Sequence, residues 1–323
     1  MSRGLDRDDD GRDYYSERVR QARQAAEDVR RQLERDPPEE KAESREPDVE
    51  IHRLPSRTLP TEREPDRRSG FERRREVDHR DRTYRLRDSE IQSLTDVGRF
   101  RTVDAADLRD HGYNGDRRRA RADLDSLRDQ GLITTHRIRT ANGGRLDVVV
   151  LSEDGRDLAD RFDQASDQRH YSGLVKPREV EHDAAIYRMF QAEAERIRAD
   201  GGEVTRVVLD YELKAKVFGA LEKRRQGEPD GEDFEGFQAK VAQENGLWVV
   251  DQRIPLPDLQ IEFRTADGDL SRVNLELTTE NYKGSQIAAK AGAGFKLYAL
   301  GDSSGGGSPV RDEREVTADI LSL

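Results

Sequence analysis

The chain has 323 residues, which is enough for two domains of ordinary size. It contains no cysteine, so disulfides, thiolate metal sites and cysteine nucleophiles are excluded. Charged residues make up 39% of the chain, hydrophobic residues make up 33%, and the formal net charge is −11. Because folded domains carry roughly 25% charged residues, part of this chain is expected to lack a hydrophobic core.

The sequence lacks two kinds of apolar segment. No apolar run is long enough to span a membrane. The first residues include no apolar segment of the kind that signal peptides carry. We therefore expect a cytoplasmic protein without a membrane partner.

The part expected to lack a core is the N-terminal arm, residues 1–83. Its first 80 residues include 20 basic, 22 acidic and only 17 hydrophobic residues. Such a stretch buries too little apolar surface to offset the entropy lost on folding. The arm is therefore predicted to be mainly disordered, with helical composition over residues 13–35. That helix would either be solvated or bind a protein partner.

Three short helices are predicted at the start of the first domain, residues 84–164. Asp88, Thr102 and Asp116 are the expected N-caps, and Gly112 and Gly131 are expected to end the second and third helices. Two β-prone runs follow, at residues 132–140 and 146–151, and an Ala-Asn-Gly-Gly turn separates them. A helix over residues 154–162 closes the segment. Three helices followed by a β-hairpin are typical of a winged helix-turn-helix.

The third helix and the hairpin form the predicted DNA-binding surface. With Ala120, Leu124 and Leu127 in the core, the helix presents arginines on its other faces. Such a helix enters the major groove of duplex DNA. The alternatives are an ordinary solvated surface or a protein-binding surface. The expected DNA-binding residues are Arg117, Arg118, Arg119, Arg121, Arg137, Arg139 and Arg145.

A polar linker at residues 165–178 separates this segment from a second α/β domain, residues 178–301. Its expected elements, in chain order, are a helix at 180–201, a strand at 204–209, helices at 214–225 and 234–245, strands at 247–250, 258–265 and 270–278, a helix at 284–291 and a strand at 296–300. Residues 302–323 are expected to be a flexible linker and a short C-terminal helix.

The strands at 258–265 and 270–278 carry the most chemistry. Their apolar residues alternate with polar ones, so a shared apolar face requires paired residues whose numbers sum to an even value. A three-residue loop with Gly268 in the left-handed conformation gives a sum of 534 and places Asp258 opposite Glu276. Adjacent carboxylates repel unless a cation lies between them, and oxygen ligands suit Mg²⁺ or Mn²⁺. The alternative is an ordinary hairpin with a solvated polar face.

These motifs resemble a known family. Pro257-Asp258, then Glu276, then a lysine resembles the PD-(D/E)xK nucleases. The order of VEHDAAIY with His182, VVLDYELK, LPDLQIEF, LELTTE and Lys290 before Tyr298, together with the winged helix, resembles the replication-relaxation family of plasmids and integrative mobile elements. The resemblance covers roughly residues 84–300. It implies an α+β fold in which a winged helix precedes a restriction-endonuclease-like domain, with Asp258, Glu276 and Lys290 catalytic and Asp258 and Glu276 holding the metal.

One position departs from the nuclease pattern. The lysine normally follows the glutamate by two residues, where this chain has Thr278, so Lys290 or Lys283 would have to replace it. Two hypotheses remain: a nuclease that uses Mg²⁺ or Mn²⁺ on double-stranded DNA, or a non-catalytic DNA-binding regulator or scaffold without a cofactor.

Three other residues are open to two interpretations. His182 is either part of the site or a capping or surface residue, and Glu212 is either a further acid of the site or the solvated end of a strand. Trp248 is expected to be a packing residue.

Overall fold

A computed structural model of the chain describes residues 49–54, 73–140, 143–164, 167–174, 179–226, 234–278 and 282–299. The helices expected over residues 13–35 and after residue 302 lie outside these ranges. The described residues form two compact units. The larger unit is built from residues 49–210 and 257–299, and the smaller from residues 211–256. This division does not follow the boundary expected at residues 165–178. It falls inside the expected second domain, between residues 210 and 211 and between residues 256 and 257.

The first part of the larger unit, here called the helix–hairpin segment (residues 88–162), holds four helices and three strands. Its strands form a small antiparallel sheet in the order β4-β6-β5. In chain order the elements are α2 (Asp88–Phe100), β4 (Val103–Asp104), α3 (Ala105–Gly112), α4 (Arg117–Asp129), β5 (Ile133–Arg139), β6 (Arg145–Leu151) and α5 (Glu153–Phe162).

The caps of these helices follow the sequence in part. Asp116 caps α4 as expected, because its carboxylate accepts hydrogen bonds from the backbone of the first turn. Gly131, in the left-handed conformation, ends it. The other two expected caps are wrong. Asp88 is already the first residue of α2. Thr102 does not cap α3; Asp104 does, because residues 103–104 pair with β6 as a short strand before the helix begins.

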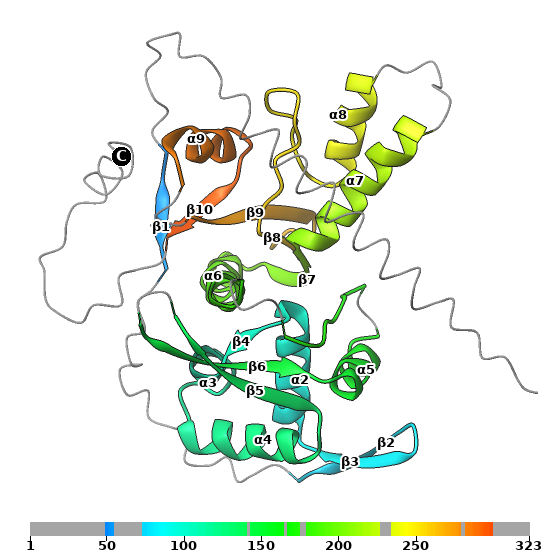
Figure 1. Ribbon diagram of the computed structural model, residues 1–323, viewed down its shortest axis with the longest axis vertical. Coiled ribbons are helices and arrows are strands. Elements are labelled where there is room, and N and C mark those ends of the chain that lie inside the picture. Colours follow the sequence, from blue (N-terminus) through cyan, green and yellow to red (C-terminus); the bar gives the residue numbers. More distant parts are fainter. Residues whose placement is uncertain are drawn as a thin grey trace, which may run out of the picture. The chain divides into compact units, whose positions relative to one another are not determined.

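A five-stranded sheet forms the second part of the larger unit. Its order is β1-β10-β9-β8-β7, with parallel pairing from β1 to β9 and antiparallel pairing from β9 to β7. The helix α6 (Val180–Ala199) covers one face, and α9 (Gly284–Gly292) lies on the other (Figure 1). The strands are β1 (Ile51–Arg53), β7 (Glu203–Leu209), β8 (Leu259–Arg264), β9 (Leu270–Thr278) and β10 (Lys296–Ala299).

The register of the β8–β9 hairpin is the one that the alternation predicts. Leu259 pairs with Leu275 and Arg264 with Leu270, so every pair sums to 534. Gly268 has a φ of 89°, which is the left-handed conformation that the three-residue loop requires. The predicted register is confirmed.

The helix α6 joins the sheet to the helix–hairpin segment (Figure 1). Phe100 of α2 packs on two α6 rings, with centroids 5.1 Å from Tyr187 and 4.8 Å from Phe190. Arg188 of α6 donates to Asp107 of α3 at 2.9 Å. In the expected linker, Gln168 is buried and exchanges two hydrogen bonds with the backbone of Val207 in β7. This part of the chain therefore fixes the two expected domains to each other within one unit.

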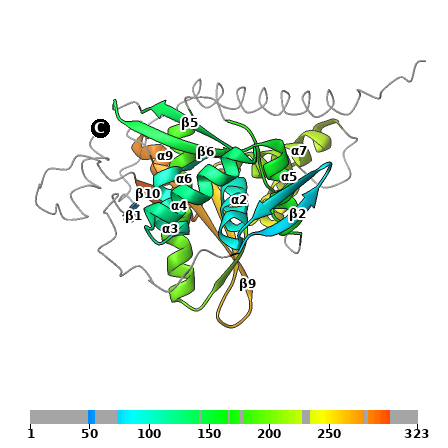
Figure 2. The same ribbon diagram turned by 90° about the horizontal axis from the view of Figure 1, so that it is seen from below.

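The prediction of an arm without a core is wrong for residues 49–54 and 73–83. Residues 51–53 form β1, and the buried Leu54 continues the pairing with a hydrogen bond to the carbonyl of Ala299. Two further strands, β2 (Arg75–His79) and β3 (Arg82–Leu86), form a hairpin beside α5 (Figure 2). Average composition hid these strands, because only Val77, Tyr84 and Leu86 provide their buried side chains.

The smaller unit contains most of α7 (Asp210–Gln226) and α8 (Phe234–Glu244). The strand expected at residues 247–250 is absent from the described chain, where only Val250 and Arg253 form a single bridge. Trp248 was expected to pack, but its exposed fraction is 69%. Within the described ranges, no helix is both long and apolar enough to cross a membrane.

Leu54 tests whether the early residues contribute to the core. Because its side chain is 1% exposed, Leu54→Ala should lower the free energy of unfolding by about 2–4 kcal/mol. Arg53→Ala, at an exposed position of the same strand, should change it by less than ~0.5 kcal/mol. Denaturant unfolding measures both. Equal stability of Leu54→Ala and the unaltered chain would show that β1 is dispensable.

Candidate functional site

Two carboxylates lie side by side where β8 begins and β9 ends. Asp258 directly precedes β8, and the register places it opposite Glu276. The backbone N–H of Asp258 donates to Glu276 Oε2 at 3.2 Å, and the N–H of Leu277 donates to Asp258 Oδ2 at 2.9 Å. The Glu276 side chain is 1% exposed and the Asp258 side chain 17%. The predicted juxtaposition of the two acids is therefore present, and it is buried.

The lysine expected from the next helix reaches this pair. Lys290, on α9, places its Nζ 2.8 Å from Glu276 Oε1. The other candidate, Lys283, is exposed just before α9 begins. Thr278, at the position where the nuclease pattern has lysine, donates its hydroxyl hydrogen to the carbonyl of Tyr298 at 3.0 Å and so holds β9 to β10. Of the two lysines, Lys290 is the one that contacts the acids.

Tyr282 is a site residue that the sequence reading missed. Its hydroxyl donates to Glu276 Oε1 at 2.6 Å. Burial and the neighbouring Glu276 raise the pKa of Tyr282, so the hydroxyl remains a hydrogen-bond donor. Its position in the sequence, shortly after Glu276 and just before α9, could have suggested a role at the site. No sequence pattern, however, shows that the Tyr282 hydroxyl points toward Glu276.

His182 completes the contacts at the second acid. It lies in the first turn of α6, with Nε2 3.3 Å from Asp258 Oδ2 and Nδ1 3.6 Å from Asp183 Oδ1. Burial alone would lower the pKa of His182, but hydrogen bonds to Asp183 and Asp258 outweigh it and raise the pKa to about 10. His182 is therefore a cation at neutral pH, and it belongs to the site rather than to the open surface.

The two acids differ in their electrostatics. Burial opposes ionisation of Asp258, but His182 and the Leu277 N–H outweigh it, and the pKa of Asp258 is lowered. Burial and the charge of Asp258 raise the pKa of Glu276, although Lys290 and Tyr282 act against them. Burial and the adjacent Asp258 therefore both disfavour the ionised form of Glu276. Such a pair of hard oxygen donors fits Mg²⁺ or Mn²⁺, which would offset the repulsion.

The predicted DNA-binding arginines lie on α4 and on the β5–β6 hairpin. Arg121 is 86% exposed and lies 3.7 Å from Asp125 on the same helix. Arg137 pairs with Asp147 across the hairpin at 2.8 Å, and this carboxylate offsets part of the positive charge of the hairpin. All seven are exposed except Arg119, which is half-buried. The arrangement leaves positive charge on both elements.

One pair on the hairpin is unusual. Arg139 lies directly opposite Arg145 in the register of β5 and β6. Like charges at directly opposed positions destabilise a hairpin unless a counter-ion lies near them. An anion beside this pair would remove that cost.

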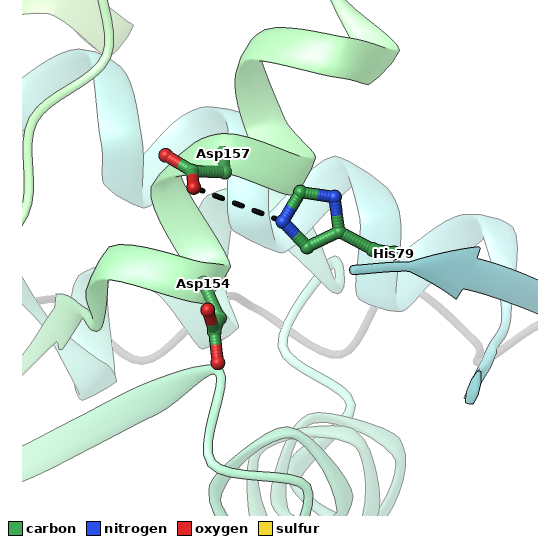
Figure 3. A group of neighbouring side chains, drawn as sticks. All are labelled: His79, Asp154 and Asp157. Carbon is green, nitrogen blue, oxygen red and sulfur yellow. Dashed lines mark ion pairs between the residues drawn. The ribbon is translucent and has the colours of Figure 1, made fainter. Parts of the chain in front are cut away.

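A second group of metal-ligand types lies between β2 and α5 (Figure 3). His79 Nε2 is 3.7 Å from Asp157 Oδ2, and Asp154 is adjacent. Arg80 forms ion pairs with both aspartates, and Arg156 pairs with Asp157 at 2.9 Å. Because guanidinium groups already balance these carboxylates, the cluster attaches the β2–β3 hairpin to α5 and is a poor cation site.

Glu212, the other acid singled out in the sequence, belongs to the smaller unit. It lies on α7, where Lys216 Nζ is 2.9 Å from its Oε1, one helical turn away. At the predicted site the acids are therefore Asp258 and Glu276, with Asp183 behind His182.

His182 gives a test of these electrostatics. Its stabilising contribution is complete below the unfolded-state pKa of 6.5 and is lost as the pH rises through the folded-state value of about 10. The stability difference between the unaltered protein and His182→Gln should therefore shrink between pH 6.5 and pH 10. Denaturant unfolding across this range measures it. In NMR titrations Asp258→Asn should lower the pKa of His182, and an imidazole midpoint near 6.5 in the unaltered chain would contradict the assignment.

Comparisons of the chain with protein-family models, with curated proteins and with solved structures found no match. The functional assignment therefore depends on the residues and the geometry described above.

Proposed function

We propose that this protein binds duplex DNA and cleaves or nicks its phosphodiester backbone with a divalent cation held by Asp258 and Glu276. The observation that carries the proposal is the position of Lys290, whose amine lies 2.8 Å from Glu276 although it comes from a different element than the usual lysine. A lysine beside two carboxylates is what the nuclease hypothesis requires.

Each residue has a role that its surroundings support. The oxygens of Asp258 and Glu276 would hold Mg²⁺ or Mn²⁺, which activates a water molecule and neutralises charge on the phosphate. Lys290 would stabilise the negative charge that develops on the phosphate oxygens. His182 is a positioning residue, because it fixes the orientation of the Asp258 carboxylate through a 3.3 Å contact.

The order of elements in the helix–hairpin segment supports DNA as the partner. A helix, a short strand, two helices and a β-hairpin follow one another, which is the element order of winged helix-turn-helix domains, and in such a domain α4 would be the helix that enters the major groove. The opposed Arg139 and Arg145 favour a phosphate at the hairpin. With the motif order noted above, this supports a role in replication, relaxation or transfer of a plasmid or mobile element.

One observation favours the non-catalytic alternative. Thr278 occupies the usual lysine position and makes a buried structural hydrogen bond. A site that had lost cleavage but kept its charges would still bind DNA. The alternative is a DNA-binding regulator or scaffold with a degenerate nuclease fold.

The DNA-binding surface is tested by replacing Arg118 and Arg121 together with alanine. Binding to duplex DNA should weaken, and the log–log dependence of affinity on salt should flatten by roughly 0.9 per lost phosphate contact. Fluorescence anisotropy at several salt concentrations measures both. Arg128→Ala, at the other end of α4 and paired with Asp125, is the control and should change the slope less. An unchanged slope in the double variant would rule out this surface.

Cleavage is tested with supercoiled plasmid DNA and Mn²⁺. The unaltered protein should nick it, and Asp258→Asn should lose at least ~100-fold in rate because a metal ligand is removed. Lys283→Met, which alters an exposed lysine beside the same helix, should retain the rate. If DNA binding persists without nicking under any metal condition, the regulator or scaffold is the better description.

A further inference from the structure

We infer that Lys290 and Tyr282 occupy Glu276 in the metal-free site, so that the divalent cation and the DNA bind cooperatively, with the DNA phosphate drawing Lys290 away from Glu276. This inference rests on the proposed function and adds how the same site is regulated.

The first step is the occupancy of the Glu276 oxygens. Oε1 faces two donors, Lys290 Nζ at 2.8 Å and the Tyr282 hydroxyl at 2.6 Å. Oε2 accepts the Asp258 N–H at 3.2 Å. The side chain is 1% exposed. A cation that is to bind Oε1 must therefore displace a donor that already lies at hydrogen-bonding distance.

The second step is the charge balance of the site. The Lys290 ammonium lies 2.8 Å from Glu276 Oε1. A divalent ion that enters beside Glu276 would meet this positive charge at close range, and like charges repel strongly where solvent is excluded. Metal binding to the DNA-free protein should therefore be weak.

The third step is what a phosphodiester changes. A phosphate group at the site adds negative charge that attracts both the ion and the Lys290 ammonium. Lys290 is able to move, because its side chain is 21% exposed and lies at the end of a flexible stem. In its position beside Glu276 the ammonium also lies 5.2 Å from the centre of the Phe295 ring. When Lys290 turns to the phosphate, Oε1 becomes available to the metal.

The consequence is reciprocal coupling. If DNA raises the affinity for the metal, the metal raises the affinity for DNA by the same factor. For one ammonium displaced from one carboxylate oxygen we expect on the order of tenfold, within the usual range for such coupling. The part of this factor that passes through Lys290 disappears when its charge is removed.

The experiment measures Mn²⁺ binding to the full chain by electron paramagnetic resonance, with and without a short mixed-sequence duplex. The same duplex with Glu276→Gln protein gives the Mn²⁺ that the DNA itself binds. In the unaltered protein the duplex should raise Mn²⁺ affinity about tenfold. Lys290→Met keeps the apolar stem. It should bind Mn²⁺ more tightly without DNA than the unaltered protein does, and the duplex should raise its Mn²⁺ affinity by a smaller factor than in the unaltered protein.

Two further variants complete the design. Lys283→Met removes the same charge at an exposed position near the site, and it should keep the coupling, which separates displacement of Lys290 from a general field effect. Tyr282→Phe removes one donor to Oε1. It should raise Mn²⁺ affinity without DNA while leaving the coupling through Lys290 in place. Thermal unfolding confirms that each variant is folded.

The outcomes separate this inference from the proposed function. Equal Mn²⁺ affinity with and without DNA in the unaltered protein overturns the inference and leaves the metal site intact. Coupling as large in Lys290→Met as in the unaltered protein also overturns it. No Mn²⁺ binding in any variant, with or without DNA, overturns the metal-dependent function itself.

Discussion

The larger unit depends on how it accommodates two carboxylates at adjacent positions of one hairpin. Glu276 is almost fully buried, and Asp258 lies directly opposite it. Water cannot screen their repulsion there, so other parts of the chain must supply the compensating charge and hydrogen bonds. They come from three places: His182 on α6, Lys290 on α9, and Tyr282 on the loop before α9. The site therefore requires both helices to pack on opposite faces of the same sheet.

The helix α6 also connects the carboxylate pair to the helix–hairpin segment. Its first turn carries His182, its middle packs against Phe100 of the helix–hairpin segment, and Arg188 pairs with the buried Asp107 of α3. Gln168 adds a second connection, from the expected linker to β7. Because the same helix carries a site residue and packs on α2 and α3, the candidate DNA-binding elements and the carboxylate pair belong to one compact unit. These contacts disfavour independent motion of the two expected domains.

Local and periodic signals in the sequence were sufficient for several elements. The alternation of β8 and β9 and the need for Gly268 in a left-handed turn fixed the register, and with it the neighbourhood of Asp258 and Glu276. The Asp116 cap and the Gly131 stop set the bounds of α4. These features depend on interactions between residues close in the sequence, which is why pattern alone was informative.

Other features depend on partners far along the chain. The three-residue β1 exists because β10, over 240 residues later, offers a free edge. His182 would be an ordinary polar residue of a first helical turn if α6 did not begin close to Asp258, the residue before β8. The β2–β3 hairpin was predicted to be disordered because its residues are highly charged. In the structure Arg80 forms ion pairs with Asp154 and Asp157, which attach the hairpin to α5. Trp248 shows the opposite error, since a large apolar residue was assumed to be buried and is exposed.

The position of Lys290 bears on the proposed nuclease function. What the chemistry needs is an ammonium beside two metal-binding carboxylates, and the chain can supply it from any element whose side chain reaches that point. In this chain the usual position is occupied by Thr278, whose hydroxyl joins β9 to β10, while Lys290 reaches Glu276 from α9. A lysine on a separate helix also differs physically from one on the same strand. A strand lysine is held by the sheet beside the acid, whereas the ammonium of Lys290 depends on the packing of α9 and on the loop that carries Tyr282. Under the inferred coupling, a bound DNA phosphate would lengthen the distance from Lys290 to Glu276.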